Sequence, residues 1–337
     1  MVDAPMKSFD FEEGRIKQEI AKLGAKRVLL QFPEGLKPEA PRIAKLVEAN
    51  GALPIISADP CYGACDLAAS EAEGLGADLI VHFGHAKLTI SKIPTVYVEA
   101  RSTVAVKTAV EKALPLISKY HKIGLATTVQ HLDTLKQIRT MLLKAGKTVM
   151  VGNCGETLYP GQVIGCNYSN VTSIVGQVEA FLFVGGGMFH ALGIALSTSK
   201  PTIIADPYDS RAFSINAETQ KIIKQRWTCI EEAQKAKVFG IIVGLKPGQK
   251  HFDQSVEVKE LAEKHGKMAF LLAGREIAPE TLLEFPSIDA YVNTACPRIS
   301  LEAPQKFSKS VLTVNEFMVA VGEDSWENML RKGLFAN

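Results

Sequence analysis

The sequence lacks an excess of charge of either sign, because 38 lysine and arginine residues are balanced by 36 aspartate and glutamate residues. This balance excludes the strongly basic surface of a typical nucleic-acid-binding protein. The N-terminus also lacks a basic region followed by an apolar stretch, so we expect no secretory signal and a cytoplasmic protein. The 6 cysteines are therefore expected to be thiols, available for a metal, rather than a disulfide framework.

Several short motifs are absent as well. The chain contains no G-x-S-x-G, P-loop or H-E-x-x-H pattern, which excludes the commonest hydrolase and phosphoryl-transfer sites. One stretch without charged residues, 180–197, is long enough to raise the question of a membrane span. It contains glycines and a histidine, and its pattern changes from strand type to helix type, so it predicts a buried strand, a glycine turn and a buried helix. We expect no membrane segment.

Short apolar runs alternate with amphipathic helical patterns, and the same order returns three times along the chain. The runs of strand type are VLLQF (28–32), LPIISA (53–58), DLIVHFG (78–84), IGLAT (123–127), TVMVG (148–152), AFLFVGGG (180–187), VFGIIVG (238–244), MAFLLAG (268–274) and DAYVNTAC (289–296). Continuous apolar strands separated by helices are typical of parallel sheets that are covered on both faces. The fold class is therefore α/β, and the repeat predicts three similar small parallel-sheet domains at 1–102, 103–210 and 211–337, with linkers near 100–121 and 207–237.

One cysteine of each predicted domain follows a strand, in a loop of small residues, proline or asparagine. Cys61 follows the second strand of the first domain, Cys166 lies in a loop after the second strand of the second, and Cys296 closes the third strand of the third. Because ligands collect at the carboxyl ends of parallel strands, these thiols suggest a shared metal site. The alternative for each cysteine by itself is a small buried core residue.

The other cysteines carry weaker signals. Cys65 forms only a C-x-x-x-C pair with Cys61, and we expect it to face its own helix and pack. Cys154 lies in the loop that also contains Cys166 and is a second candidate ligand, whereas Cys229 lies in a helical pattern and is expected in the core.

Two histidines occupy the position that Cys296 has in the third domain. His85 and His190 follow the third strands of the first two domains, so we expect them to line a common cavity, although each by itself is more typical of a hydrogen-bonded structural histidine. The glycines Gly185, Gly186 and Gly187 permit close approach of a ligand to the backbone, but they do not complete G-x-G-x-x-G and are equally consistent with a tight structural turn.

Several segments in combination resemble the radical enzyme family of diphthamide biosynthesis. They are LQFPEGL (30–36), ADPCYGACD (58–66), TTVQHL (127–132), GQVIGCNYS (161–169), FVGGGMFH (183–190) and NTACPRIS (293–300), which together span nearly the whole chain. The resemblance implies three α/β domains arranged around a central [4Fe–4S] cluster held by Cys61, Cys166 and Cys296. Three thiolates leave one iron open for a substrate.

The resemblance also implies a reaction. Such an enzyme transfers the 3-amino-3-carboxypropyl group of S-adenosylmethionine to C2 of a histidine in translation elongation factor 2, as a homodimer supplied by an electron donor. The candidate contacts to S-adenosylmethionine are Gln31, Glu34, Gly185, Gly186, Gly187, His85, His190 and Arg298, with Arg298 facing the substrate carboxylate.

Two other functions fit the same pattern of cysteines. A quinolinate synthase-like enzyme shares the plan of three domains around one cluster but uses the cluster as a Lewis acid in a dehydration. A structural scaffold would bind iron–sulfur or zinc without turning over a cofactor. Perturbation of a reduced cluster by added S-adenosylmethionine distinguishes the radical enzyme from the dehydratase, whereas metal binding without turnover of a cofactor favours the scaffold.

Overall fold

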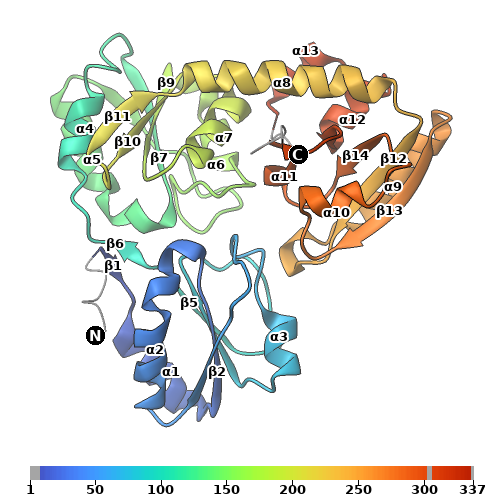
Figure 1. The fold of residues 1–337 in the computed structure, drawn as a ribbon. Coiled ribbons are helices and arrows are strands. Elements are labelled where there is room, and N and C mark those ends of the chain that lie inside the picture. Colours follow the sequence, from blue (N-terminus) through green and yellow to red (C-terminus); the bar gives the residue numbers. More distant parts are fainter. Residues whose placement is uncertain (1–7, 302–305, 335–337) are drawn as a thin grey trace.

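The computed structural model describes residues 8–301 and 306–334. Its main sheets lie in three lobes that surround a common centre (Figure 1). We call the lobes the first unit (8–102), the second unit (103–214) and the third unit (216–334). The division differs from the predicted one at the end of the second unit, because strand β11 (Arg211–Ser214) pairs with β10 (Thr202–Asp206) across the predicted boundary.

The three units follow one another along the chain. The first contains β1 (Phe9–Asp10), α1 (Glu13–Leu23), β2 (Arg27–Gln31), η1 (Glu34–Glu39), α2 (Ala40–Glu48), β3 (Leu53–Ile56), α3 (Ala69–Gly74), β4 (Leu79–Phe83), β5 (Thr95–Val98) and β6 (Arg101–Ser102). The second adds α4 (Lys107–Ala113), β7 (Lys122–Thr127), η2 (Val129–Thr134), α5 (Leu135–Lys144), β8 (Thr148–Met150), α6 (Ser169–Thr172), η3 (Val175–Gln177), β9 (Ala180–Val184) and α7 (Phe189–Thr198), followed by β10 and β11. The third comprises α8 (Asn216–Gln234), β12 (Val238–Gly244), η4 (Pro247–Gln249), α9 (Phe252–Lys264), β13 (Met268–Gly274), α10 (Pro279–Leu283), β14 (Ala290–Asn293), α11 (Pro297–Leu301), β15 (Val311–Thr313), α12 (Val314–Ala320) and α13 (Trp326–Lys332).

The main sheets repeat one topology. Their strand orders are β3-β2-β4-β5, β8-β7-β9-β10 and β13-β12-β14-β15, with every neighbouring pair parallel. Strand β11 adds an antiparallel edge to the second sheet, and β1 pairs with β6 in a separate two-stranded ribbon. The predicted class of three parallel-sheet α/β units is confirmed.

An acidic residue marks the same corner of each sheet. Asp78, Glu179 and Asp289 precede the third strand of their units, and one carboxylate oxygen of each accepts hydrogen bonds from two successive backbone N–H groups where the first strand begins. These backbone donors lower the pKa of all three carboxyl groups. The shared device supports the interpretation of the chain as a repeated unit.

The central strands of each sheet are buried on both faces, as continuous apolar strands require. In β2, Val28 and Leu30 pack into one core cluster while Leu29 packs into another on the opposite face. Strand β12 does the same with Ile241 and Ile242. The apolar stretch 180–197 forms strand β9, the glycine turn and helix α7, as predicted. Among the described residues, no helix has both the length and the apolarity needed to cross a bilayer.

Candidate active site

A cavity of about 420 Å³ lies where the three units meet. Cys65 of the first unit, Cys166 of the second and Cys296 of the third all line it. They come from loops that follow β3, β8 and β14, at the carboxyl ends of the parallel strands. This is the edge at which parallel α/β sheets bind ligands.

The three cavity thiols are close enough to influence one another. Burial, followed by the proximity of Cys65 and Cys296, raises the pKa of the Cys166 thiol to about 12. Thiolates crowded in this way repel one another, so the unliganded site favours the protonated form. A bound cation reverses that preference, because a metal-ligating thiol is deprotonated.

Cys65 reaches the cavity because the third unit holds its loop. The backbone N–H of Gly248 donates to the Cys65 carbonyl oxygen at 2.7 Å, and Gln249 Nε2 donates to Cys65 Sγ at 3.4 Å. Helix α3 begins only at Ala69, so Cys65 lies in an irregular loop and does not pack against its own helix as the sequence suggested. The expectation for Cys65 is corrected by this geometry.

Cys61 does not line the cavity with Cys166 and Cys296. Its side chain is buried, and its backbone N–H donates to Glu34 Oε1 at 3.4 Å. A ligating atom of Cys61 lies within 4.8 Å of ring nitrogens of His82 and His85, so these three side chains form a group of possible metal ligands. The first-unit cysteine that lines the cavity is therefore Cys65 and not Cys61, the cysteine expected from the sequence.

The remaining cysteines lie away from the cavity wall. Cys154 is half-buried, and its carbonyl oxygen accepts hydrogen bonds from Thr157. Cys229 packs against the core of the third unit, as predicted, with Arg226 Nη1 at 3.7 Å from its sulfur.

A second set of side chains, again one from each unit, lines the same cavity. It consists of His85, His190 and Arg298. Burial lowers the pKa of His190 to about 4, with further contributions from Arg298 and His85, and burial also lowers the pKa of His85 to about 4. Both imidazoles are therefore neutral near pH 7, whereas the guanidinium of Arg298 is charged and lies 4.1 Å from the centre of the Phe189 ring.

A chain of hydrogen bonds fixes the orientation of His85. Gln31 Nε2 donates to the Asp66 carbonyl oxygen at 2.6 Å, which leaves Gln31 Oε1 to accept from His82 Nδ1 at 2.8 Å. His82 Nε2 lies 3.0 Å from His85 Nδ1, so His85 is the donor in that bond. Gln31, a predicted substrate contact, thus serves inside the first unit and does not line the cavity.

Among the other predicted substrate contacts, some line the cavity and some do not. Glu34 lies outside the cavity wall, where it pairs with Lys37 at 3.2 Å. Of the three glycines after β9, only Gly186 lines the cavity. A β-carbon at Gly185 would lie 2.9 Å from a ring carbon of Phe183, and a β-carbon at Gly186 would lie 2.9 Å from a ring carbon of Tyr208. The packing of these rings therefore requires glycine at both positions.

The sequence interpretation assigned no role to two buried polar residues of the cavity, His131 and Gln162. His131 lies in η2 just after β7, and Gln162 bridges to Thr127 at the end of the same strand. Their position in the sequence could have identified them, because both are polar side chains beside the carboxyl end of a buried strand.

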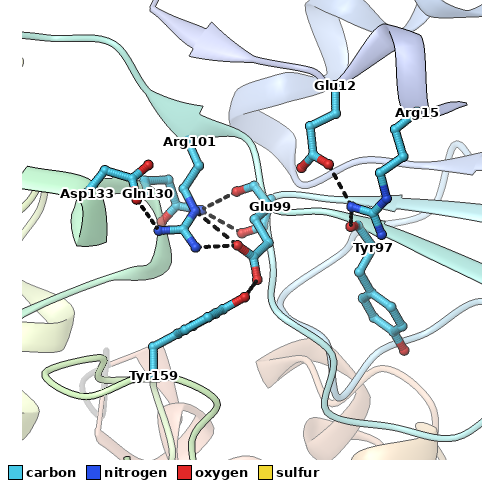
Figure 2. Close-up of polar contacts among 9 residues, drawn as sticks. Glu12, Arg15, Tyr97, Glu99, Arg101, Gln130, Asp133 and Tyr159 are labelled. Atoms are coloured by element: carbon cyan, nitrogen blue, oxygen red, sulfur yellow. Dashed lines mark hydrogen bonds and ion pairs between the residues drawn. The ribbon is translucent and has the colours of Figure 1, made fainter.

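Polar contacts join the first and second units beside the cavity (Figure 2). Arg101 forms an ion pair with Glu99 at 2.6 Å, and Tyr159 of the second unit donates its hydroxyl to Glu99 Oε1 at 2.8 Å. Gln130 Nε2 donates to the Gly84 carbonyl oxygen at 2.7 Å, next to His85. These contacts set the position of His85 relative to the second unit.

One of the contacts between the first and third units is a buried ion pair. Lys246 Nζ lies 2.9 Å from Asp66 Oδ2 and 2.6 Å from Glu276 Oε1, and Lys246 and Asp66 are only 3% and 2% exposed. Because Asp66 directly follows Cys65, this pair ties the cysteine loop to the third unit.

These features define a class: a three-unit parallel α/β protein whose units each bring one thiol to a shared cavity. The comparisons with known proteins identify the family. The family model of diphthamide synthesis proteins matches residues 32–330. The chain belongs to the diphthamide synthesis family.

Individual relatives agree with that assignment. The 2-(3-amino-3-carboxypropyl)histidine synthase of Pyrococcus horikoshii is 37% identical over 316 residues, which cover 93% of this chain and 91% of the relative. Subunit 1 of the Candida glabrata synthase is 31% identical over 328 residues, which cover 94% of this chain and 75% of the relative. The crystal structure of Dph2 from Pyrococcus horikoshii with a 4Fe-4S cluster superposes with a TM-score of 0.87 at 36% identity, over 94% of this chain and 92% of that chain. Of the functions expected from the sequence, these similarities favour diphthamide synthesis over a quinolinate synthase-like dehydratase.

Proposed function

We propose that this chain transfers the 3-amino-3-carboxypropyl group of S-adenosylmethionine to a histidine of translation elongation factor 2, the first step of diphthamide biosynthesis. The observation that carries the proposal is the convergence of three thiols, one from each unit, in a single cavity. The family and the name of the Pyrococcus horikoshii relative supply the chemistry. A translation factor as protein substrate implies a cytoplasmic location.

Cys65, Cys166 and Cys296 are the proposed ligands of a [4Fe–4S] cluster. The donor set fits such a group, since soft thiolates are the usual cluster ligands. Burial and then the proximity of the other two thiols raise the Cys166 pKa, and a bound cation would favour the deprotonated form. When bound, the cluster supplies an electron and one iron without a protein ligand. Cys65 replaces Cys61 in this role because Cys65 is the first-unit thiol that lines the cavity.

The second ring of side chains suits a sulfonium substrate that carries a carboxylate. Arg298 provides the positive charge for the carboxylate. His85 and His190 are neutral, because burial lowers the pKa of each to about 4, and neutral imidazoles do not repel the positive sulfonium. Gly186 lines the wall without a side chain. Gln31, Glu34, Gly185 and Gly187 lie outside the lining and are not proposed as contacts.

The position of the bound S-adenosylmethionine determines which carbon–sulfur bond of its sulfonium breaks. Near-attack positioning of reacting groups contributes about 7–11 kcal/mol, enough to select the bond on the amino-acid side of the sulfonium. The acceptor supports a radical, because C2 of imidazole is a poor nucleophile and a two-electron alkylation favours a ring nitrogen. The reaction therefore requires an external electron donor.

A second copy of the chain is the proposed partner in a homodimer. Strand β13 is an edge of the third sheet, and Met268 and Phe270 on one of its faces are 57% and 52% exposed. Leu283 and Phe285, in and just after α10 of the same unit, are also exposed. An apolar patch on a sheet edge is typical of a surface that pairs with another chain. Light scattering that gives the mass of a single chain at micromolar concentration would contradict the dimer.

The test of the proposed reaction is an anaerobic assay. The iron-reconstituted protein is mixed with dithionite, S-adenosylmethionine and elongation factor 2, and the products are separated by chromatography and mass spectrometry. We expect methylthioadenosine that depends on the reductant, with a carbon-linked adduct on one histidine. Release of mainly 5′-deoxyadenosine, or cleavage without the reductant, contradicts the mechanism.

A further inference from the structure

Two buried polar side chains of the cavity have hydrogen-bonding atoms that no described residue satisfies. His131 is 1% exposed, and neither its Nδ1 nor its Nε2 has a hydrogen-bond partner within residues 8–301 and 306–334. Gln162 is 2% exposed, and its Oε1 is also without a partner in the described part of the chain. Buried polar groups are nearly always paired, and leaving one unpaired costs free energy. Both residues line the cavity, and a ligand bound there would lie beside them.

The surroundings fix the state of the His131 ring. It packs edge-on against Tyr208, with ring centroids 5.4 Å apart and an interplanar angle of 62°. Burial lowers the pKa of His131 to about 4, in spite of the nearby Asp206 carboxylate. At neutral pH the ring therefore carries one N–H donor and one bare nitrogen. The unpartnered atoms of His131 and Gln162 thus comprise one donor and two acceptors, and neither side chain is charged.

We propose that His131 and Gln162 form the nucleobase subsite of this cavity, in which they recognise the edge of adenine. Gln162 Oε1 accepts from the exocyclic amine, and the N–H of His131 donates to an adjacent ring nitrogen. An adenine edge presents this pairing of a donor beside an acceptor. The assignment rests on the proposed function, since S-adenosylmethionine carries the adenine.

The charged end of the substrate matches this pair poorly. A carboxylate only accepts hydrogen bonds, so it would oppose Gln162 Oε1 and the nearby Asp206, whereas Arg298 of the third unit provides a positive partner. An ammonium only donates, which would leave the N–H of His131 unpaired. Flat and apolar neighbours, among them Val129 and Tyr208, also line the cavity and suit a planar ring.

The test compares two nucleosides that differ only in the base. Binding of 5′-methylthioadenosine and 5′-methylthioinosine to the reconstituted protein is measured by titration calorimetry without oxygen. The inosine compound places a carbonyl oxygen where adenine has its amine, so we expect it to bind at least about 10-fold more weakly to the unaltered protein. This comparison needs no variant. Equal affinities overturn the proposal.

Variants then assign the contacts. His131→Phe keeps a ring but removes both nitrogens, and we expect it to weaken methylthioadenosine binding by about 10- to 100-fold. Gln162→Met removes the acceptor and is expected to abolish most of the preference for adenine. The matched control is His121→Phe, at an exposed position of the same unit, which should leave both affinities unchanged. Circular dichroism confirms that each variant is folded.

The outcomes separate this inference from the proposed function. If His131→Phe weakens binding of S-adenosylmethionine but not of methylthioadenosine, the residue contacts the amino-acid end and the nucleobase assignment is wrong. If both variants bind like the unaltered protein, the inference also fails while the proposed function stands. Failure of the unaltered protein to bind S-adenosylmethionine at all contradicts the proposed function itself.

Discussion

Two loops deliver a thiol to the same cavity but are held in different ways. The loop after β3 carries Cys65 and spans residues 57–68 without a helix or strand, whereas the turn after β14 places Cys296 only three residues beyond the strand. The first loop depends on contacts with a distant part of the sequence, and the second depends on its own neighbours.

Long-range contacts hold the first loop. Lys246 forms an ion pair with Asp66, while Gly248 and Gln249 donate hydrogen bonds to the backbone and sulfur of Cys65. All of these partners belong to the third unit. Within the first unit, Gln31 donates to the Asp66 carbonyl oxygen and Thr89 to the Ala64 carbonyl oxygen of the same loop. The position of Cys65 therefore depends on both units.

Local contacts hold the second loop. Asn293, the last residue of β14, donates from Nδ2 to the Cys296 carbonyl oxygen at 2.7 Å and to Ser300 Oγ at 3.2 Å. Its Oδ1 accepts from the backbone N–H of Ala295 at 2.9 Å. An asparagine that bonds the backbone two residues on forms a turn without outside help. A short stretch of sequence thus determines where Cys296 lies.

The largest predicted effect separates Cys65 from Cys61, its neighbour four positions away. We expect Cys65→Ala to lose the cluster after anaerobic reconstitution, because only two cavity thiols would remain to hold it. Cys61→Ala should retain it, since Cys61 is not among the residues that line the cavity. Iron content and visible absorption of the two proteins measure the difference.

Further cysteine variants complete that comparison. Cys166→Ala and Cys296→Ala should behave like Cys65→Ala, whereas Cys154→Ala and Cys229→Ala should keep their iron. A colourless Cys61→Ala protein beside a normal Cys65→Ala protein would restore the assignment made from the sequence and refute the one made from the structure.

The same contrast explains what could be predicted from the sequence. Strands such as 123–127 and 238–244 were recognisable because burial on both faces demands continuous apolar residues, and the repeat of three units followed from their order. Cys166 and Cys296 line the cavity, where thiols in loops after strands were expected to converge. Cys65 was not expected there, because contacts with residues 246–249, far away in the sequence, hold its loop. For the same reason, the sequence around Gln31 does not show that its side chain orients His82 instead of lining the cavity.

The next largest effect concerns the tie between the first and third units. Lys246→Met leaves the buried Asp66 carboxylate without its cationic partner, and breaking a buried pair in this way costs about 3–5 kcal/mol of unfolding free energy. Urea denaturation of the metal-free protein measures the loss. In the same protein, iodoacetamide followed by mass spectrometry should show faster alkylation of Cys65 while the rate for Cys296 is unchanged.

Two matched variants test the cause. Lys332→Met breaks an ion pair with Asp324 whose lysine side chain is 57% exposed, so we expect a loss of at most about 1 kcal/mol. The double variant Lys246→Met with Asp66→Asn removes the uncompensated charge and should recover much of the stability. Equal losses for Lys246→Met and Lys332→Met would show that the buried pair does not tie the units together.

The smallest effect is expected at the locally held loop. Asn293→Ala removes the acceptor for Ala295 and the donor to Cys296 at a site only 4% exposed, which should lower the free energy of unfolding by about 1–3 kcal/mol. Asn293→Asp is the matched variant, because its carboxylate still accepts from Ala295 but cannot donate to the Cys296 carbonyl. If the turn is built locally, both variants speed the alkylation of Cys296 in the metal-free protein and leave that of Cys65 unchanged, the reverse of the pattern for Lys246→Met. An equal increase at both cysteines in every variant would mean that the three units open together, and the distinction between a locally held loop and one held by another unit would then be wrong.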